Sequence, residues 1–125
     1  MPNLRFAAPK ERRVAIVTGG ARGIGGATAI RMAEEGRDIV IADLLEVEAT
    51  ETIAKIEALG QKALFVPTDV SDEKAVRAMT QRALDTFGRL DILVCCAGIF
   101  GKETPFLDID AATFVRFLRI NVLGV

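Results

Sequence analysis

The sequence predicts an α/β fold in which a doubly wound parallel sheet is truncated after the fourth strand and the helix that follows it. Three features of the chain lead to this prediction. Short apolar runs of strand length alternate four times with longer segments whose apolar residues recur every three or four positions, the spacing of one helix face. The stretches between successive strands are long enough for helical crossovers, which join parallel strands with a right-handed turn. A cluster of glycines separates the first strand from the first helix.

The first strand is predicted at Val14 to Val17, an uninterrupted apolar run typical of a strand that is covered on both faces. Glycines stand at positions 19, 20, 23, 25 and 26, where the first helix must begin. Apolar residues at helical spacing then continue this helix towards Gly36, at which it is expected to end.

The remaining elements are predicted from the same two kinds of pattern. Strands are predicted at three further apolar runs: Asp38 to Asp43, Ala63 to Val66 and Leu90 to Cys95. Helices are predicted over 49–59 and 72–87, and a last helix is predicted to be capped by Asp108 or Asp110 and to include Val125. Ser71 is predicted to cap the third helix, because a serine oxygen accepts a hydrogen bond from a free N–H group at a helix start.

The bulk composition is that of a globular domain without a strong charge bias. Of the 125 residues, 50% are hydrophobic and 26% are charged, and the formal net charge is −1. No nucleic-acid partner and no membrane partner is expected, because these require a clustered basic surface or a long apolar run. Residues 1–12 lack the apolar core of a secretory signal and are predicted to be a flexible N-terminal tail of a cytoplasmic protein. Residues 13–125 are expected to form one domain, the front part of a longer protein.

Several residue types that often carry catalysis are missing from the chain. It has no histidine, no tyrosine and a single serine, Ser71, which excludes a tyrosine acid, a histidine base and a serine triad within these residues. The two cysteines, Cys95 and Cys96, are neighbours, which disfavours a disulfide between them, and without histidine they predict no metal site. They are predicted to be small buried residues or backbone contacts, with a redox role as the alternative.

The glycine cluster has the composition of an anion-binding turn. The first N–H groups of a helix lack intrahelical partners and the helix dipole is positive there, so a phosphate group binds well if no side chain intrudes. Gly19 allows the sharp turn, Gly23 removes a Cβ that would keep a pyrophosphate away, and Gly25 lets the helix pack closely on the strand. The spacing is G-x-x-x-G-x-G, and the alternative interpretation is a tight turn without a ligand.

Asp43 and Arg22 bear on the choice of cofactor. Asp43 ends the second strand roughly 20 residues past the glycine turn, where a carboxylate accepts hydrogen bonds from a ribose diol and repels a 2′-phosphate. This predicts NAD, with NADP less favoured. Arg22 argues the other way, because a guanidinium pairs well with a 2′-phosphate. The alternatives are that Asp43 only caps the next segment, and that Arg22 is solvated or lies along the pyrophosphate.

Several motifs together resemble those of the short-chain dehydrogenase/reductase family, over nearly the whole chain after Arg13. They are Thr18 to Gly25, Asp43, Asp69 with Val70, Cys96 to Gly98, and Asn121. The resemblance implies a Rossmann-like dinucleotide-binding domain, here over 13–125, whose cofactor lies across the carboxyl ends of the strands.

The same resemblance implies roles for individual residues. Those implied to bind the cofactor are Gly19, Gly23, Ile24 and Gly25 at the pyrophosphate, Asp43 at the adenosine ribose, and Asp69 and Val70 at the adenine. The family's Asn-Asn-Ala-Gly segment stands here as Cys95, Cys96, Ala97 and Gly98. Its backbone contact with the cofactor is expected to remain, whereas the side-chain bonds of its asparagines are lost.

Asn121 lies on the apolar face of the last predicted helix, where an amide without a partner would cost roughly 1–3 kcal/mol. A polar group is therefore expected to meet it. The resemblance implies a catalytic role, in which this asparagine holds a water molecule in a proton relay with a lysine. The alternative is an asparagine that bonds nearby backbone or sits at a helix irregularity.

The resemblance implies an NAD-dependent oxidoreductase that interconverts a small-molecule alcohol and a ketone. The family's serine and its Tyr-x-x-x-Lys pattern would follow Val125. The 125 residues of this chain alone are therefore expected to bind the cofactor without turnover. Family members are commonly dimers or tetramers, which implies a homo-oligomer for the full-length protein. The alternatives are a dinucleotide-binding sensor without chemistry and a flavodoxin-like nucleotide fold, the second being disfavoured by the joint presence of Asp43 and Asn121.

Overall fold

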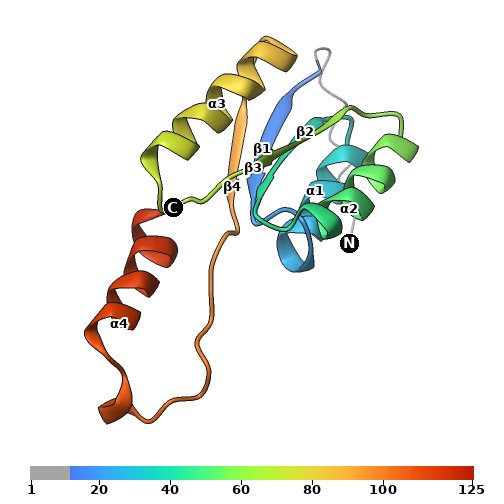
Figure 1. Ribbon diagram of the computed structural model, residues 1–125. Helices are drawn as coiled ribbons and strands as arrows, with labels where there is room; N and C mark the ends of the chain where they lie inside the picture. The colour runs from blue at the N-terminus through green and yellow to red at the C-terminus, as the bar shows by residue number, and fades with distance from the viewer. Residues whose placement is uncertain (1–11) are drawn as a thin grey trace, which may run out of the picture.

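Strands and helices alternate along the chain in the computed structural model, which describes residues 12–125 (Figure 1). The strands are β1 (Val14–Thr18), β2 (Asp38–Asp43), β3 (Ala63–Pro67) and β4 (Ile92–Cys95). The helices are α1 (Gly23–Glu34), α2 (Glu46–Ala58), α3 (Glu73–Phe87) and α4 (Ala111–Leu118), with a 3-10 turn at Phe106–Asp108 and a π-helical turn at Arg119–Leu123. Apart from Arg12, the predicted tail over 1–12 lies outside the described residues.

The four strands form one sheet in the order β3-β2-β1-β4, and every pair is parallel. β1 is central: Val14 lies opposite Asp38 of β2, and Ala15 lies opposite Ile92 of β4. The chain adds β2 and β3 on one side of β1 and then crosses to the other side for β4. This confirms the predicted doubly wound parallel sheet. β4 begins two residues later than predicted, at Ile92, which is its first residue paired with β1.

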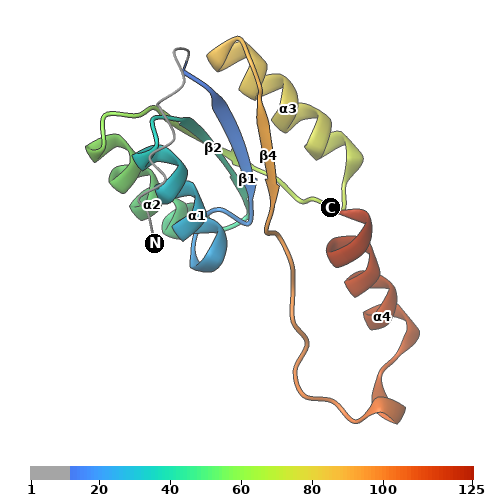
Figure 2. The same cartoon turned by 180° about the vertical axis from the view of Figure 1, so that it is seen from behind.

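Helices cover both faces of the sheet, as Figures 1 and 2 show, with α1 and α2 on one face and α3 on the other. Successive side chains of a strand point to opposite faces, so β1 contributes to two cores. Ala15 and Val17 pack with α1 and α2, whereas Val14 and Ile16 pack with α3. Every residue of β1 is buried, which agrees with the uninterrupted apolar run from which it was predicted.

The start of α3 differs from the prediction. Asp72, not Ser71, is its N-cap, because the Asp72 side chain accepts a hydrogen bond from the Lys74 N–H (2.9 Å). Ser71 is engaged elsewhere: its N–H and its hydroxyl both donate to Oδ1 of Asp69, at 2.9 and 2.6 Å. The predicted capping serine therefore belongs to the turn before the helix.

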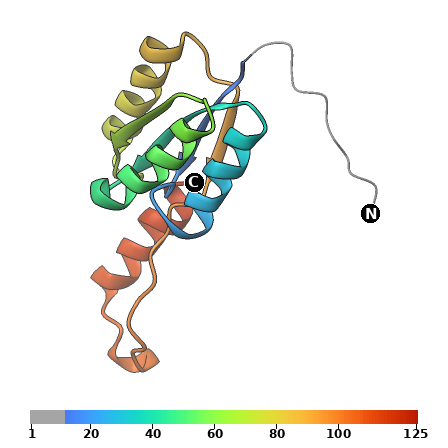
Figure 3. The same cartoon turned by 90° about the vertical axis from the view of Figure 1, so that its right-hand side faces the viewer.

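The segment after β4 leaves the sheet, and α4 extends beyond the carboxyl ends of the strands (Figures 2 and 3). Asp110 caps α4 by accepting from the Thr113 N–H (2.7 Å), which decides between the two predicted caps. The prediction that the helix includes Val125 is wrong, because the helical turns end at Leu123. None of the helices in residues 12–125 combines the length and the apolar character needed to cross a membrane.

β4 forms one edge of the sheet in the described part of the chain. Ile92 and Val94 pack on the α1 and α2 side of the sheet, whereas Leu93 and Cys95, on the opposite face of β4, are exposed. Of the two alternatives predicted for the cysteines, burial does not hold for Cys95, which is exposed, while Cys96 is half-buried and contacts the backbone of β1 through its N–H group.

Asp91 joins the start of β4 to the start of β1. Its Oδ2 accepts from the Val14 N–H (2.8 Å), and the Arg89 guanidinium donates to both carboxylate oxygens, at 2.9 and 2.7 Å. The Arg89 hydrogen bond, followed by that of Val14, lowers the pKa of Asp91 from an ordinary value of 3.8 to about 2.

Asp91→Asn is expected to lower the urea midpoint of unfolding at pH 7 and to have a much smaller effect near pH 2. The reason is that a folded-state pKa below the unfolded one stabilises the protein above the unfolded pKa, and this contribution is lost as the pH falls from 3.8 to about 2. Urea unfolding followed by circular dichroism over this range checks the prediction, with the surface variant Asp85→Asn as a control. An equal loss of stability at both ends of the range would contradict it.

Candidate functional site

The loops that follow β1 and β4 meet at the carboxyl end of the sheet. Strand order reverses at β1, and ligands of doubly wound sheets bind in the crevice at such a reversal. A Cβ added to Gly19, in the loop after β1, would lie 2.7 Å from the backbone N of Ala97, in the loop after β4. The two loops are therefore in direct backbone contact, and predicted site residues come from both.

Thr18 fastens these two loops together. Its Oγ1 accepts from the N–H groups of Cys96 and Ala97, both at 3.2 Å, and its carbonyl oxygen also accepts from the Cys96 N–H (3.1 Å). The predictions gave Thr18 no binding role of its own. The sequence did carry a signal for this role, because Thr18 is a hydroxyl residue at the end of an otherwise apolar run. In the structure its side chain is buried.

The glycine turn approaches its surroundings too closely for side chains at three positions, Gly19, Gly20 and Gly25. Gly19 has a left-handed φ of 65°. A Cβ on Gly25 would lie 2.1 Å from the carbonyl oxygen of Gly19 and 3.2 Å from Cβ of Cys96. Gly25 thus permits close contact between the start of α1 and the two loops.

The first turn of α1 is open to a ligand. Arg22 is its N-cap residue and makes no capping hydrogen bond with its side chain, and the turn contains no acidic residue. A Cβ on Gly23 would meet no atom within 4 Å, and the Ile24 side chain is exposed. The N–H groups at this end of α1 therefore lie beside unobstructed space, which is the arrangement that the pyrophosphate prediction requires.

Asp43 contacts both the glycine turn and the start of the α2 segment. Its Oδ2 accepts from the Ala21 N–H (3.0 Å), and its Oδ1 accepts from the N–H groups of Leu44 (2.7 Å) and Leu45 (3.1 Å). The capping alternative is therefore present, together with a bond to the turn. An ionised carboxylate has about four acceptor positions, so these three bonds leave capacity for a ligand hydroxyl.

Arg22 leaves the glycine turn towards α2. Its side chain is 69% exposed, and Nη1 lies 3.9 Å from Oε1 of Glu48. Of the alternatives considered from the sequence, the structure shows a largely solvated guanidinium, with an additional acidic neighbour that the sequence patterns did not indicate.

Asp69 and Val70 follow β3 at the same end of the sheet. The hydroxyl of Ser71 and then its N–H group lower the pKa of Asp69, and the charge of Arg116 lowers it further. Val70 borders the end of the chain, since a Cβ on Gly124 would lie 2.7 Å from a methyl group of Val70. The predicted adenine-binding pair lies near the carboxyl end of β2, since the N–H group of the preceding Thr68 donates to the Asp43 carbonyl oxygen (3.0 Å).

Asn121 lies in the π-helical turn after α4 and bonds one residue of the loop after β4. Its Oδ1 accepts from the Ile99 N–H (2.8 Å), and its Nδ2 donates to the Ile99 carbonyl (3.0 Å). The polar group expected to meet this amide is thus the Ile99 backbone, and both parts of the structural alternative are seen. Oδ1 also borders Gly98, where an added Cβ would lie 3.3 Å away.

A doubly wound parallel sheet with a glycine turn at its strand reversal is a Rossmann-type NAD-binding fold. Residues 13–125 match the family described as short chain dehydrogenase, and the chain belongs to this family. The family comprises oxidoreductases that use nicotinamide cofactors, which confirms the resemblance found in the sequence.

Known relatives match about nine tenths of the chain. It is 52% identical over 119 residues to 3-hydroxyacyl-CoA dehydrogenase type-2 of Drosophila melanogaster, covering 89% of this chain and 44% of the relative. It is 44% identical over 113 residues to cis-4-hydroxycyclohexanecarboxylate dehydrogenase of Sinomonas cyclohexanicum, covering 90% and 45%. The crystal structure of carveol dehydrogenase from Mycobacterium avium in complex with NAD superposes with a TM-score of 0.83 at 28% identity, covering 90% and 45%. The chain thus spans less than half the length of these relatives.

Proposed function

We propose that this chain is the cofactor-binding part of an NAD-dependent oxidoreductase that transfers a hydride between a small-molecule alcohol and a ketone. The observation that carries the proposal is the Asp43 carboxylate, which accepts from the Ala21 N–H at the glycine turn (3.0 Å) beside the open first turn of α1. An acceptor for ribose hydroxyls and donors for phosphate oxygens are thereby placed next to each other. Family membership and the NAD complex of a structural neighbour support the same function.

Each part of the cofactor is proposed to contact a different group of residues. In the proposal the N–H groups at Gly23, Ile24 and Gly25 bind the pyrophosphate, and Asp43 binds the adenosine ribose. Asp69 and Val70 border the adenine. Cys96, Ala97 and Gly98 would line the part of the crevice nearest β4, where Thr18 holds the N–H groups of Cys96 and Ala97.

The proposed reaction needs groups from both halves of the protein. Bound NAD would supply the hydride acceptor. Asn121 keeps the backbone at Ile99 in place and is proposed to take part in the proton relay. A serine and a Tyr-x-x-x-Lys pair from the remainder of the protein would provide the acid and base, so residues 13–125 form a binding domain that turns over nothing alone. A cytoplasmic homo-oligomer is the proposed context.

Isothermal titration calorimetry on the full-length protein tests the proposal. NAD is expected to bind more tightly than NADP. In a separate assay, NAD-dependent oxidation of simple secondary alcohols is expected, measured as the rise in absorbance of the reduced nicotinamide. Absence of heat with both dinucleotides would refute the binding function. Tight NAD binding without turnover of any alcohol or ketone would favour the alternative, a dinucleotide-binding sensor without chemistry.

A further inference from the structure

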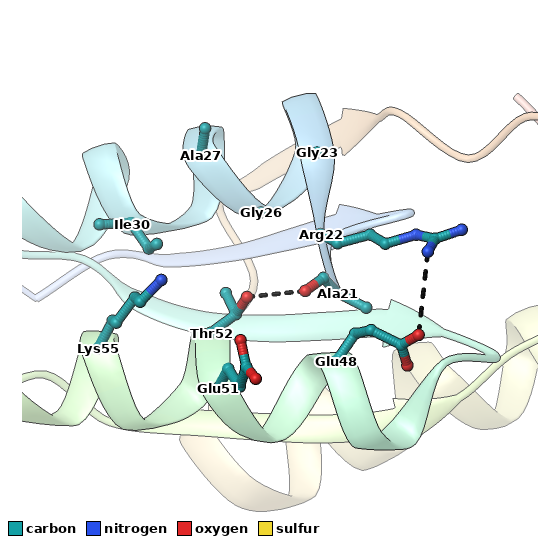
Figure 4. A pocket seen from close by; sticks show the side chains of 10 residues that line it. All are labelled: Ala21, Arg22, Gly23, Gly26, Ala27, Ile30, Glu48, Glu51, Thr52 and Lys55. Atoms are coloured by element: carbon teal, nitrogen blue, oxygen red, sulfur yellow. Dashed lines mark hydrogen bonds and ion pairs between the residues drawn. The ribbon is translucent and has the colours of Figure 1, made fainter.

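One face of α2 holds the glycine turn. Thr52, on that face, is buried, and its Oγ1 donates to the Ala21 carbonyl at 2.7 Å. The Ala21 N–H is held by Asp43, so both polar groups of this peptide residue are fixed by the β2–α2 unit. Figure 4 shows Thr52 and Glu48, four residues apart, presenting their side chains to the turn from the same side of α2. The backbone just before Arg22 is therefore held in a fixed position relative to β2 and α2.

Arg22 lines one end of a pocket of about 300 Å³ between α1 and α2, and its guanidinium lies beside Glu48 (Figure 4). Nη1 of Arg22 and Oε1 of Glu48 are 3.9 Å apart, with 69% and 40% of the two side chains exposed. The other cation that lines this pocket, Lys55, lies at its opposite end. Arg22 is thus the cation of the pocket that projects from the glycine turn itself, and its nearest carboxylate partner is Glu48.

A dinucleotide with a 2′-phosphate would need such a cation. The phosphate would replace the ribose hydroxyl that Asp43 is proposed to bind, and a guanidinium neutralises phosphate oxygens with paired hydrogen bonds. Glu48 competes for the same guanidinium as an internal anion. We propose that Glu48 is a coenzyme-selectivity residue, which holds Arg22 against α2 and so weakens binding of NADP while NAD binding is nearly unaffected. This inference depends on the proposed function, namely that the glycine turn binds a nicotinamide dinucleotide.

The Glu48→Gln variant of the full-length protein tests this role. Calorimetric titration at low ionic strength is expected to show NADP binding tightened by about two- to fivefold, the range that an exposed ion pair supports, with NAD affinity unchanged. Glu51→Gln is the matched control: Glu51 lines the same pocket on the same helix but belongs to none of the ion pairs among residues 12–125. It removes the same charge and is expected to leave the ratio of the two affinities unchanged.

A double variant separates an effect through Arg22 from simple charge repulsion. In an Arg22→Gln background, Glu48→Gln is expected to give no further gain in NADP affinity, since the guanidinium that it releases is absent. An unchanged ratio in Glu48→Gln, an equal shift in Glu51→Gln, or the full gain without Arg22 would each overturn the inference. If the unmodified protein binds NAD and only the ratio fails to move, the proposed function survives; if it binds neither dinucleotide, both proposals fail.

Discussion

Replacing Gly25 by alanine is expected to lower NAD affinity by at least tenfold and to destabilise the fold. The new methyl group would lie 2.1 Å from the Gly19 carbonyl oxygen and 2.8 Å from its carbonyl carbon, both of which are backbone atoms of the turn. Relief requires movement of α1 or of the turn, and overpacking of this kind costs about 1–3 kcal/mol. Calorimetry with NAD and urea unfolding measure the two effects.

Gly26→Ala is the matched control for this change. A methyl group there would meet the Gly20 carbonyl oxygen and Oγ1 of Thr52 at 3.4 Å, close to ordinary contact distance. Since alanine is favoured over glycine inside a helix by about 1 kcal/mol, this neighbouring variant is expected to bind NAD and to be at least as stable as the unmodified protein. Equal behaviour of the two variants would mean that the close approach at Gly25 does not matter for binding.

Asp43→Ala is expected to weaken NAD binding by tenfold or more and NADP binding by less. The change removes the proposed ribose acceptor, and it also leaves the N–H groups of Ala21, Leu44 and Leu45 without their present partner. Hydrogen bonds to charged groups contribute about 1.5–3 kcal/mol each, so the turn itself should loosen. NADP binding suffers less because the carboxylate that repels its 2′-phosphate is gone.

Asp43→Asn distinguishes the two contributions. The amide oxygen can still accept from the backbone near α2, while the negative charge is lost. Its stability is therefore expected to lie between that of Asp43→Ala and that of the unmodified protein, and its affinity ratio should move towards NADP. Equal losses of NAD and NADP affinity in Asp43→Ala would show that Asp43 acts only on the turn and not on the choice of cofactor.

The positions of the strands and their parallel direction were predictable, because apolar runs mark the strands and the lengths of the crossovers favour parallel pairing. β1 is buried on both faces, and this alone explains its uninterrupted apolar sequence. Its spacing assigned Asp43 to the same predicted site as the glycine turn, but its hydrogen bond to the Ala21 N–H was not predicted. The Thr52–Ala21 bond was not predicted either, and for Asn121 the sequence predicted a polar partner without identifying Ile99. These bonds join residues 22 or 31 positions apart and depend on how helices and loops pack on the sheet.

Local competition explains the remaining differences. Two neighbouring residues, Ser71 and Asp72, are both good N-caps, and the choice between them is made by Asp69, which binds both the N–H and the hydroxyl of Ser71. The burial of Cys95 was predicted from an apolar run, but an edge strand exposes one side of such a run. Neither outcome is encoded in the periodicity of the sequence.

The two hydrogen bonds between the Asn121 side chain and the Ile99 backbone join the two ends of the segment that lies between these residues. The segment between the two residues, 100–120, is a long loop with a helix whose two ends are held together by these bonds. Changes in the length or the side chains of this segment can therefore be accommodated within it without displacing Gly98, which precedes Ile99.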